Sequence, residues 1–144
     1  MRSNGPIVIV DDDEDDIEII QMAIAQLKLV NETKFFSSTK DALEYIQKPD
    51  VLPFIILSDI NMPVQNGFAF RNVIKKNEDL DVKCIPFLFI TTGATEEVVS
   101  QAYAAKAQGI FQKPPSIKKW SAMLQDIVDY WTECMAPGHF KVKV

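Results

Sequence analysis

The sequence predicts an α/β fold with three layers, in which a five-stranded parallel sheet lies between two layers of helices. One observation is that unbroken apolar runs, at residues 7–10 and 54–57, are typical of strands buried on both faces, as parallel strands usually are. A second is that strand and helix patterns alternate five times along the chain. This alternation favours parallel strands joined by right-handed crossovers, with helices on both faces of the sheet.

The first strand is predicted at residues 7–10 and runs directly into an acidic stretch at residues 11–16. A helix begins within this stretch, because apolar residues then recur at helical spacing, at Ile17, Ile20, Ile24 and Leu27. Negative charge in a first helical turn is favourable against the helix dipole, and we interpret residues 13–16 in this way.

The second and third strand–helix units follow in the same order. A strand is predicted at residues 33–37, and the short helix at residues 41–47 is ended by Lys48-Pro49-Asp50. The third strand, at residues 54–57, is followed by a helix and then by a polar loop at residues 75–83. The apolar residues that predict this helix are Phe68, Phe70, Val73 and Ile74.

The last two units complete the sheet. A strand is predicted at residues 85–90, and Thr95 is the expected N-cap of a helix that continues to residue 107. A short strand at residues 109–112 precedes the last helix, for which Ser116 is the expected N-cap. The buried face predicted for that helix is Trp120, Leu124, Ile127 and Trp131.

Length and charge limit the class of protein. A chain of 144 residues is expected to form one domain, at residues 1–134, with a C-terminal tail at residues 135–144. We expect residues 138–144 to be poorly ordered, because they follow a Pro-Gly break. A net charge of −5 argues against a nucleic-acid partner. Without a signal peptide or an apolar run of about 18 residues, we expect a cytoplasmic protein with no membrane partner.

Cysteine and histidine usage exclude several kinds of site. Cys84 and Cys134 lie far apart and in no CxxC pattern, so we interpret them as reduced thiols. His139, in the expected tail, is the one histidine of the chain. The body of the domain therefore has neither a histidine metal site nor a Ser–His or Cys–His catalytic pair.

Polar side chains follow four of the predicted strands and should meet at one edge of the sheet. They are Asp11 with Asp12, Asp59, Thr91 and Lys113. Three carboxylates in one crevice repel each other, which costs stability unless a cation or proton neutralises them. Mg²⁺ prefers carboxylate oxygens together with water and phosphate, and a lysine and a hydroxyl would contact the remaining phosphate oxygens.

With these residues in place, the chain resembles the receiver domain of two-component response regulators over residues 5–134. The matching residues are Asp11-Asp12, Asp59, Asn61-Met62-Pro63 with Gly67, Thr91 and Lys113-Pro114. The resemblance implies the flavodoxin-like strand order 2-1-3-4-5. It also implies a signalling domain that catalyses only its own phosphorylation and dephosphorylation.

The resemblance assigns a role to each matching residue. Asp59 would be the phosphoacceptor, attacking the phosphohistidine of a sensor histidine kinase or a histidine phosphotransfer protein. Asp12 and Asp59 would bind Mg²⁺ directly, together with the backbone carbonyl of Asn61, while Asp11 would hold a metal-bound water. The remaining implied roles are phosphate contacts by Lys113, Thr91 and the Thr92 N–H, and a water path lined by Asn61 and Gly93. The phosphorylated domain would then signal to a downstream protein that the sequence does not name.

Two positions depart from the family pattern. The family often has an aromatic switch residue three positions before the lysine, and this chain has Ile110 there. It often has Ala or Gly after the threonine, and this chain has Thr92. Since a β-branched residue has few rotamers and Phe111 should face the other side of the sheet, we expect a reduced response at residues 110–112.

The same residues allow three other readings. A calcium loop of the EF-hand type at residues 11–22 fails, because its sixth position is Asp16 and its twelfth is Met22. A haloacid-dehalogenase-like phosphatase also uses an Asp-x-Asp after the first strand, but its pattern requires Thr or Val where this chain has Asp15. A degenerate receiver that serves only as a docking module would keep the fold without the chemistry.

Overall fold

A computed structural model describes residues 4–135 of the chain. Its strands are β1 (Ile7–Val10), β2 (Thr33–Phe36), β3 (Ile55–Asp59), β4 (Phe87–Thr91) and β5 (Gly109–Gln112). Its helices are α1 (Glu14–Ala25), α2 (Thr39–Ile46), α3 (Gly67–Lys76), α4 (Glu78–Asp81), α5 (Glu96–Ala104) and α6 (Ile117–Glu133). The predicted disorder of residues 138–144 lies outside the described residues, and the boundary at residue 134 stays a prediction.

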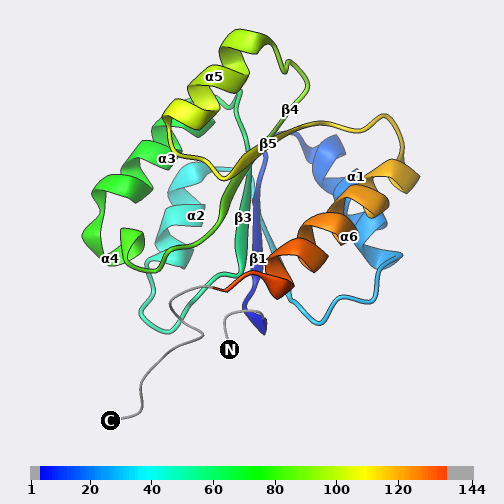
Figure 1. The fold of residues 1–144 in the computed structure, drawn as a ribbon, viewed down its shortest axis with the longest axis horizontal. Coiled ribbons are helices and arrows are strands. Elements are labelled where there is room, and N and C mark those ends of the chain that lie inside the picture. The colour runs from blue at the N-terminus through cyan, green and yellow to red at the C-terminus, as the bar shows by residue number, and fades with distance from the viewer. Residues whose placement is uncertain (1–3, 136–144) are drawn as a thin grey trace.

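All five strands form one parallel sheet in the order β2-β1-β3-β4-β5 (Figure 1). This confirms both the predicted α/β sandwich and the strand order that the resemblance implied. The order places β1 and β3 side by side, with Val10 paired to Ser58. The carboxyl ends of these two central strands therefore lie together at one edge of the sheet, where open α/β sheets place their ligands.

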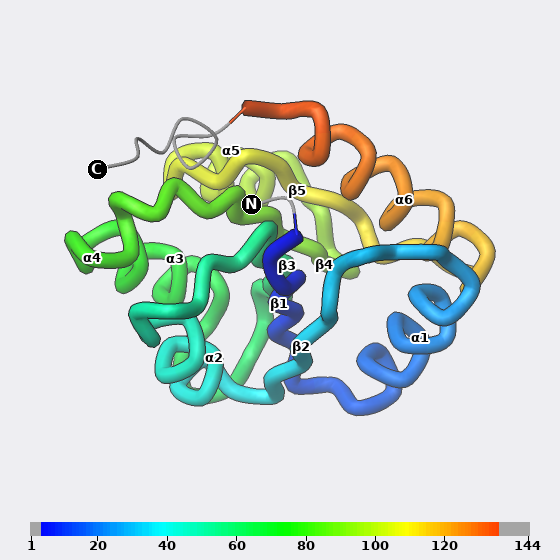
Figure 2. The backbone as a smooth tube through the Cα atoms, turned by 90° about the horizontal axis from the view of Figure 1, so that it is seen from below, coloured from blue at the N-terminus to red at the C-terminus, as the bar shows by residue number. Residues whose placement is uncertain are grey.

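Successive residues of each strand serve opposite faces of the sheet. In β1, Val8 and Val10 belong to the core cluster that includes residues of α2, α3, α4 and α5, whereas Ile7 and Ile9 belong to the cluster that includes residues of α1 and α6. Figures 1 and 2 show these two helix layers on either side of the sheet. β1, β3 and β4 are buried along their whole length, which is why they read as unbroken apolar runs in the sequence.

Short polar side chains cap the N-termini of the helices by accepting hydrogen bonds from backbone N–H groups of the first turn. The predicted caps are confirmed, since Thr95 accepts from Val98 N and Ser116 accepts from Lys119 N. Asp13 accepts from the N–H groups of Asp15 and Asp16, which confirms that α1 begins inside the acidic stretch. Each such cap typically contributes about 1 kcal/mol to stability.

The predicted polar loop at residues 75–83 is wrong, because α4 lies within it. The Asn77 side chain accepts a hydrogen bond from Leu80 N at 3.2 Å, and Leu80 is buried on the sheet. A single turn of helix has too few residues to show a periodic pattern, so only the Asn77 cap could have signalled it. Helix α5 also ends earlier than predicted, because Lys106 adopts a left-handed conformation with φ 63° and turns the chain there.

No helix within residues 4–135 has the length and apolar character that crossing a bilayer requires. Within the same range, Cys84 and Cys134 are not joined in a disulfide.

Candidate functional site

Three carboxylates meet at the carboxyl ends of the two central strands. Asp59 is the last residue of β3, and Asp11 and Asp12 directly follow β1. Among the described residues, Asp11, Asp12 and Asp59 form a group in which each contributes one carboxylate oxygen, and these three oxygens lie within 4.8 Å of one another. Asp11 and Asp59 are buried and Asp12 is exposed, so the group opens to solvent on one side. The predicted convergence of these three residues is therefore what the structure shows.

Local hydrogen bonds hold each buried carboxylate in place. Asp11 Oδ1 accepts from Asp13 N at 2.9 Å, and Asp59 Oδ1 accepts from Ile60 N at 2.8 Å. Each of these bonds uses one oxygen and fixes the direction of the side chain. The second oxygen of Asp11, Oδ2, accepts from Lys113 Nζ at 3.1 Å, so a cation near Asp11 would share this carboxylate with the ammonium.

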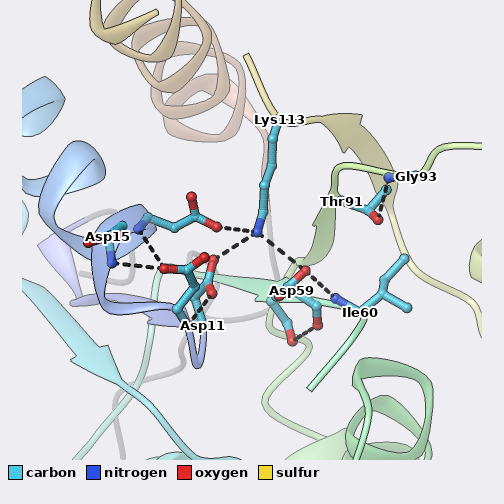
Figure 3. A network of polar contacts seen from close by, with 10 residues as sticks. Asp11, Asp15, Asp59, Ile60, Thr91, Gly93 and Lys113 are labelled. Carbon is cyan, nitrogen blue, oxygen red and sulfur yellow. Dashed lines mark hydrogen bonds and ion pairs between the residues drawn. The ribbon is translucent and has the colours of Figure 1, made fainter. Parts of the chain in front are cut away.

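Lys113 reaches into this group from the end of β5. Its backbone N–H donates to Thr91 O at 2.8 Å, which fixes where its side chain starts. The ammonium Nζ lies 2.6 Å from Asp16 Oδ2, 3.1 Å from Asp11 Oδ2 and 3.6 Å from Asp59 Oδ1 (Figure 3). The ammonium thus lies between the strand-end carboxylates and the first turn of α1.

The sequence interpretation missed the contact between Asp16 and Lys113, because it treated residues 13–16 only as charge at a helix start. A signal was available in the helical spacing. The residues that α1 buries are Ile20 and Ala23, and Asp16 lies four positions before Ile20 on the same face. Asp16 was therefore placed to point toward the sheet, unlike the exposed Asp15.

Burial dominates the electrostatics of the two buried carboxyl groups. It raises the pKa of Asp11 to about 6, although the Asp13 N–H and the Lys113 charge act in the opposite direction. Burial likewise raises the pKa of Asp59, with Lys113 and the Ile60 N–H offsetting part of the effect. Burial alone would lower the pKa of Lys113, but its hydrogen bond to Asp16 and the charges of Asp11 and Asp59 outweigh burial and raise it. The site therefore has an excess of negative charge that one ammonium does not neutralise.

The remaining predicted site residues lie around this group. Thr91 ends β4, next to β3, and its buried hydroxyl accepts from Gly93 N at 3.2 Å. Thr92 and Asn61 are exposed in the loops that follow β4 and β3. Ile110 packs among the residues that face α2 to α5, whereas Phe111 packs toward α1 and α6. This confirms that the two side chains serve opposite faces of the sheet.

Gln112 is a second residue that the sequence interpretation missed. Its Nε2 donates to Thr92 O at 2.6 Å, and its Oε1 accepts from Ala94 N at 3.3 Å. The amide thus connects the end of β5 to the loop after β4. No pattern in the sequence signals this contact, because both partners are backbone groups of another segment.

The donor set of the acidic group fits a hard divalent cation. Carboxylate oxygens are the ligands that Mg²⁺ and similar ions prefer, and three of them converge here with one side open for water or a phosphate. A cation would also relieve the repulsion between the carboxylates. The group can therefore hold such an ion next to Asp59.

A parallel sheet of order 2-1-3-4-5, with an acidic group and a lysine at its carboxyl edge, defines a phosphoacceptor domain of the receiver class. The family model described as the response regulator receiver domain matches residues 7–125, and the chain belongs to this family. It is a receiver domain of two-component signalling, and its acidic group fits the phosphoacceptor site of that family.

The chain is also similar to individual response regulators in sequence and in fold. The response regulator Rcp1 of Synechocystis sp. is 28% identical over 139 residues, which cover 92% of this chain and 93% of Rcp1. The crystal structure of the Mn²⁺-bound form of Rcp1 covers 92% of this chain and 97% of its own, with a TM-score of 0.74 and 25% identity. The crystal structure of the phosphorylated cyanobacterial phytochrome response regulator RcpA covers 93% and 99%, with a TM-score of 0.80 and 22% identity.

Proposed function

We propose that this receiver accepts a phosphoryl group on Asp59 from the phosphohistidine of a sensor histidine kinase or a histidine phosphotransfer protein. The observation that supports it is the position of Asp59, which lies at the carboxyl end of a central strand, beside two further carboxylates and an ammonium. An Asp59 oxygen attacks the phosphorus, a new O–P bond forms, and the P–N bond to the histidine breaks. The electron pair of that bond returns to the departing imidazole.

The surrounding residues would bind the metal ion, contact the phosphoryl oxygens and line the path of the hydrolytic water. Asp12, Asp59 and the Asn61 carbonyl would bind Mg²⁺ directly, and Asp11 would hold a water on it; the ion would offset the charge that keeps a phosphate from a carboxylate. The Mn²⁺-bound form of Rcp1 supports a divalent cation in a protein of similar sequence. The phosphoryl oxygens accept hydrogen bonds from Lys113, Thr91 and the Thr92 N–H. Water that hydrolyses the product passes between Asn61 and Gly93.

In this proposal the chain is no enzyme beyond its own phosphorylation and dephosphorylation, and its output is a contact with a downstream protein. We place the exchange in the cytoplasm, where cysteine thiols stay reduced. The family match does not favour a haloacid-dehalogenase-like phosphatase. A receiver that serves only for docking would not be phosphorylated on Asp59, and phosphorylation can be measured.

Incubation with acetyl phosphate and Mg²⁺ tests the proposal. We expect the intact mass of the chain to rise by one phosphoryl group and the modification to map to Asp59. A folded chain whose mass stays unchanged, with and without a phosphorylated histidine donor, would identify a docking module. Catalytic release of phosphate from small phosphomonoesters would instead support the phosphatase.

Mg²⁺ is expected to raise the melting temperature of the chain at neutral pH, because it binds the converged carboxylates only in the folded state. Asp12→Ala should abolish this rise, since it removes the exposed member of the group. The rise should be smaller at pH 5, where Asp11, with a pKa of about 6, holds a proton that competes with the ion. Differential scanning calorimetry measures all three cases, and an unchanged melting curve of the parent chain in millimolar Mg²⁺ would contradict the metal site.

Beryllofluoride with Mg²⁺, which mimics the phosphoryl group, is expected to change hydrogen exchange chiefly at residues 91–99. The hydroxyl of Thr91, which accepts from Gly93 N, is expected to turn toward the mimic and donate to it, and we expect the loop that Gln112 holds to follow. The C-terminal end of α5 should respond less, because the buried Arg71 donates to Ala105 O and Lys106 O.

Little change is expected at residues 110–112, since Ile110 has few rotamers with which to follow Thr91. Exchange measured by mass spectrometry checks this, with Asp59→Asn as the control that should show no response. Strong changes at Ile110 and along α6, with none near Thr91, would show that the signal leaves by another route.

A further inference from the structure

The partners of Lys113 belong to two different groups. Asp11 and Asp59 are members of the three-carboxylate group that fits a cation, whereas Asp16, which is in the first turn of α1, is not. Yet Asp16 makes the shortest of the three contacts, at 2.6 Å, against 3.1 Å for Asp11 and 3.6 Å for Asp59. The ammonium is thus held most closely by the carboxylate that a bound cation would leave unused.

A divalent cation and the Lys113 ammonium make conflicting demands on this crevice. Both are positive and both are attracted to Asp59, a direct ligand of the ion in the proposed site, and to Asp11, which would hold a water on the ion. When the cation occupies the site, it also repels the ammonium, whose side chain is only 10% exposed and cannot reach water without leaving the site. The ammonium can stay beside Asp59 only if another anion holds it.

We propose that Asp16 is a positioning residue, which holds the Lys113 ammonium beside the three-carboxylate group so that a divalent cation and the ammonium can occupy the crevice together. Asp16 is suited to this because α1 fixes its backbone and Asp13 caps that helix by accepting from Asp16 N at 3.4 Å. Its side chain is 24% exposed, so it keeps part of its contact with solvent while it faces the ammonium.

Removal of Asp16 should then turn Lys113 into a competitor of the metal. In the Asp16→Asn variant, Asp11 and Asp59 are the remaining carboxylate partners of the ammonium. A bound cation then competes with the ammonium at both carboxylates. The inference rests on the proposed metal site, and it predicts that Asp16 affects the cation through Lys113 and not through its own charge. A double-mutant cycle separates these two routes, because it measures the coupling between the two residues.

The experiment measures the Mg²⁺ dissociation constant at neutral pH by tryptophan fluorescence, since the buried Trp120 lines the same small cavity as Asp11 and Asp59. The heat of binding gives a second readout. Asp16→Asn is expected to raise the dissociation constant about fivefold. The matched control is Asp15→Asn, which removes the same charge from the same turn at an exposed position and should change the constant less than about twofold. Asp16→Glu, which keeps the charge, should restore binding.

The second arm repeats Asp16→Asn in a Lys113→Met background. Lys113→Met alone should tighten Mg²⁺ binding, because the competing ammonium is gone. In that background Asp16→Asn should change the dissociation constant no more than Asp15→Asn does. An equal fivefold effect with and without the lysine would overturn the inference. It would show that Asp16 attracts the cation through its own charge and not through Lys113. If the Met variant does not fold, Lys113→Gln takes its place, with circular dichroism as the check.

Failure of the inference differs from failure of the proposed function. If the parent chain binds no Mg²⁺, the metal site itself is wrong. If the parent binds Mg²⁺ and Asp16→Asn binds it as tightly as the parent, then only the role of Asp16 is wrong. Beryllofluoride adds a readout of the ammonium, since its binding should weaken in Asp16→Asn even at saturating Mg²⁺, when Lys113 is no longer held beside Asp59.

Discussion

Asp59→Asn is expected to abolish phosphorylation of the chain by acetyl phosphate and Mg²⁺, with no detectable gain of a phosphoryl group in the intact mass. The amide keeps the shape of the carboxylate and can still accept the hydrogen bond from Ile60 N. It has no oxygen with a negative charge, however, and an uncharged amide does not attack phosphorus at a useful rate. The loss should therefore be complete and chemical in origin.

Stability provides the control for this variant. Burial raises the pKa of Asp59, which means that the fold disfavours the ionised carboxylate. The neutral amide removes that cost together with the repulsion from Asp12, so the melting temperature without metal should stay the same or rise. Asp126→Asn, an exposed change on α6, should leave phosphorylation intact. Labelling of the Asp59→Asn variant at the parent level would show that another side chain is the phosphoacceptor.

Most of the site could be predicted because its residues are tied to strand ends. A strand buried on both faces appears in the sequence as an apolar run, and the first carboxylate after the run lies at its carboxyl end. In this way the sequence alone predicts Asp11 and Asp59 at one edge, and β1 and β3 are indeed neighbours. Parallel pairing then brings these residues to the same edge, since it aligns the carboxyl ends of all the strands.

The contacts that were missed have a different origin. Asp16 and Lys113 are 97 positions apart, and their pairing depends on how α1 rotates against the end of β5. Gln112 binds only backbone groups of the loop after β4, which no side-chain pattern reveals. Both contacts are specified by tertiary packing, so a reading of local patterns can propose the residue but not its partner.

Gly67→Ala is expected to destabilise the chain by about 2–4 kcal/mol, near or above the usual range for an overpacked site. Gly67 is the first residue of α3, and its N–H donates to Ile60 O at 2.8 Å, which presses the helix start against the end of β3. A Cβ at this position would lie 2.3 Å from Asp59 O and 2.9 Å from Ile60 Cα. Both are backbone atoms, so no side-chain rotation can relieve the overlap.

The sign of this effect opposes helix propensity, which favours alanine over glycine by up to about 1 kcal/mol. Nor is left-handed backbone the reason, since none of the glycines in the described residues has a positive φ. Urea unfolding measures the loss, and Gly93→Ala is the matched control, because a Cβ there meets nothing within 4 Å and should change stability by less than about 0.5 kcal/mol. If Gly67→Ala folds as stably as the parent, the loop after β3 yields easily and cannot fix the Asp59 backbone. If it folds less stably and its Mg²⁺-induced rise in melting temperature also shrinks, the contact at Gly67 is what holds Asp59 at its place in the acidic group.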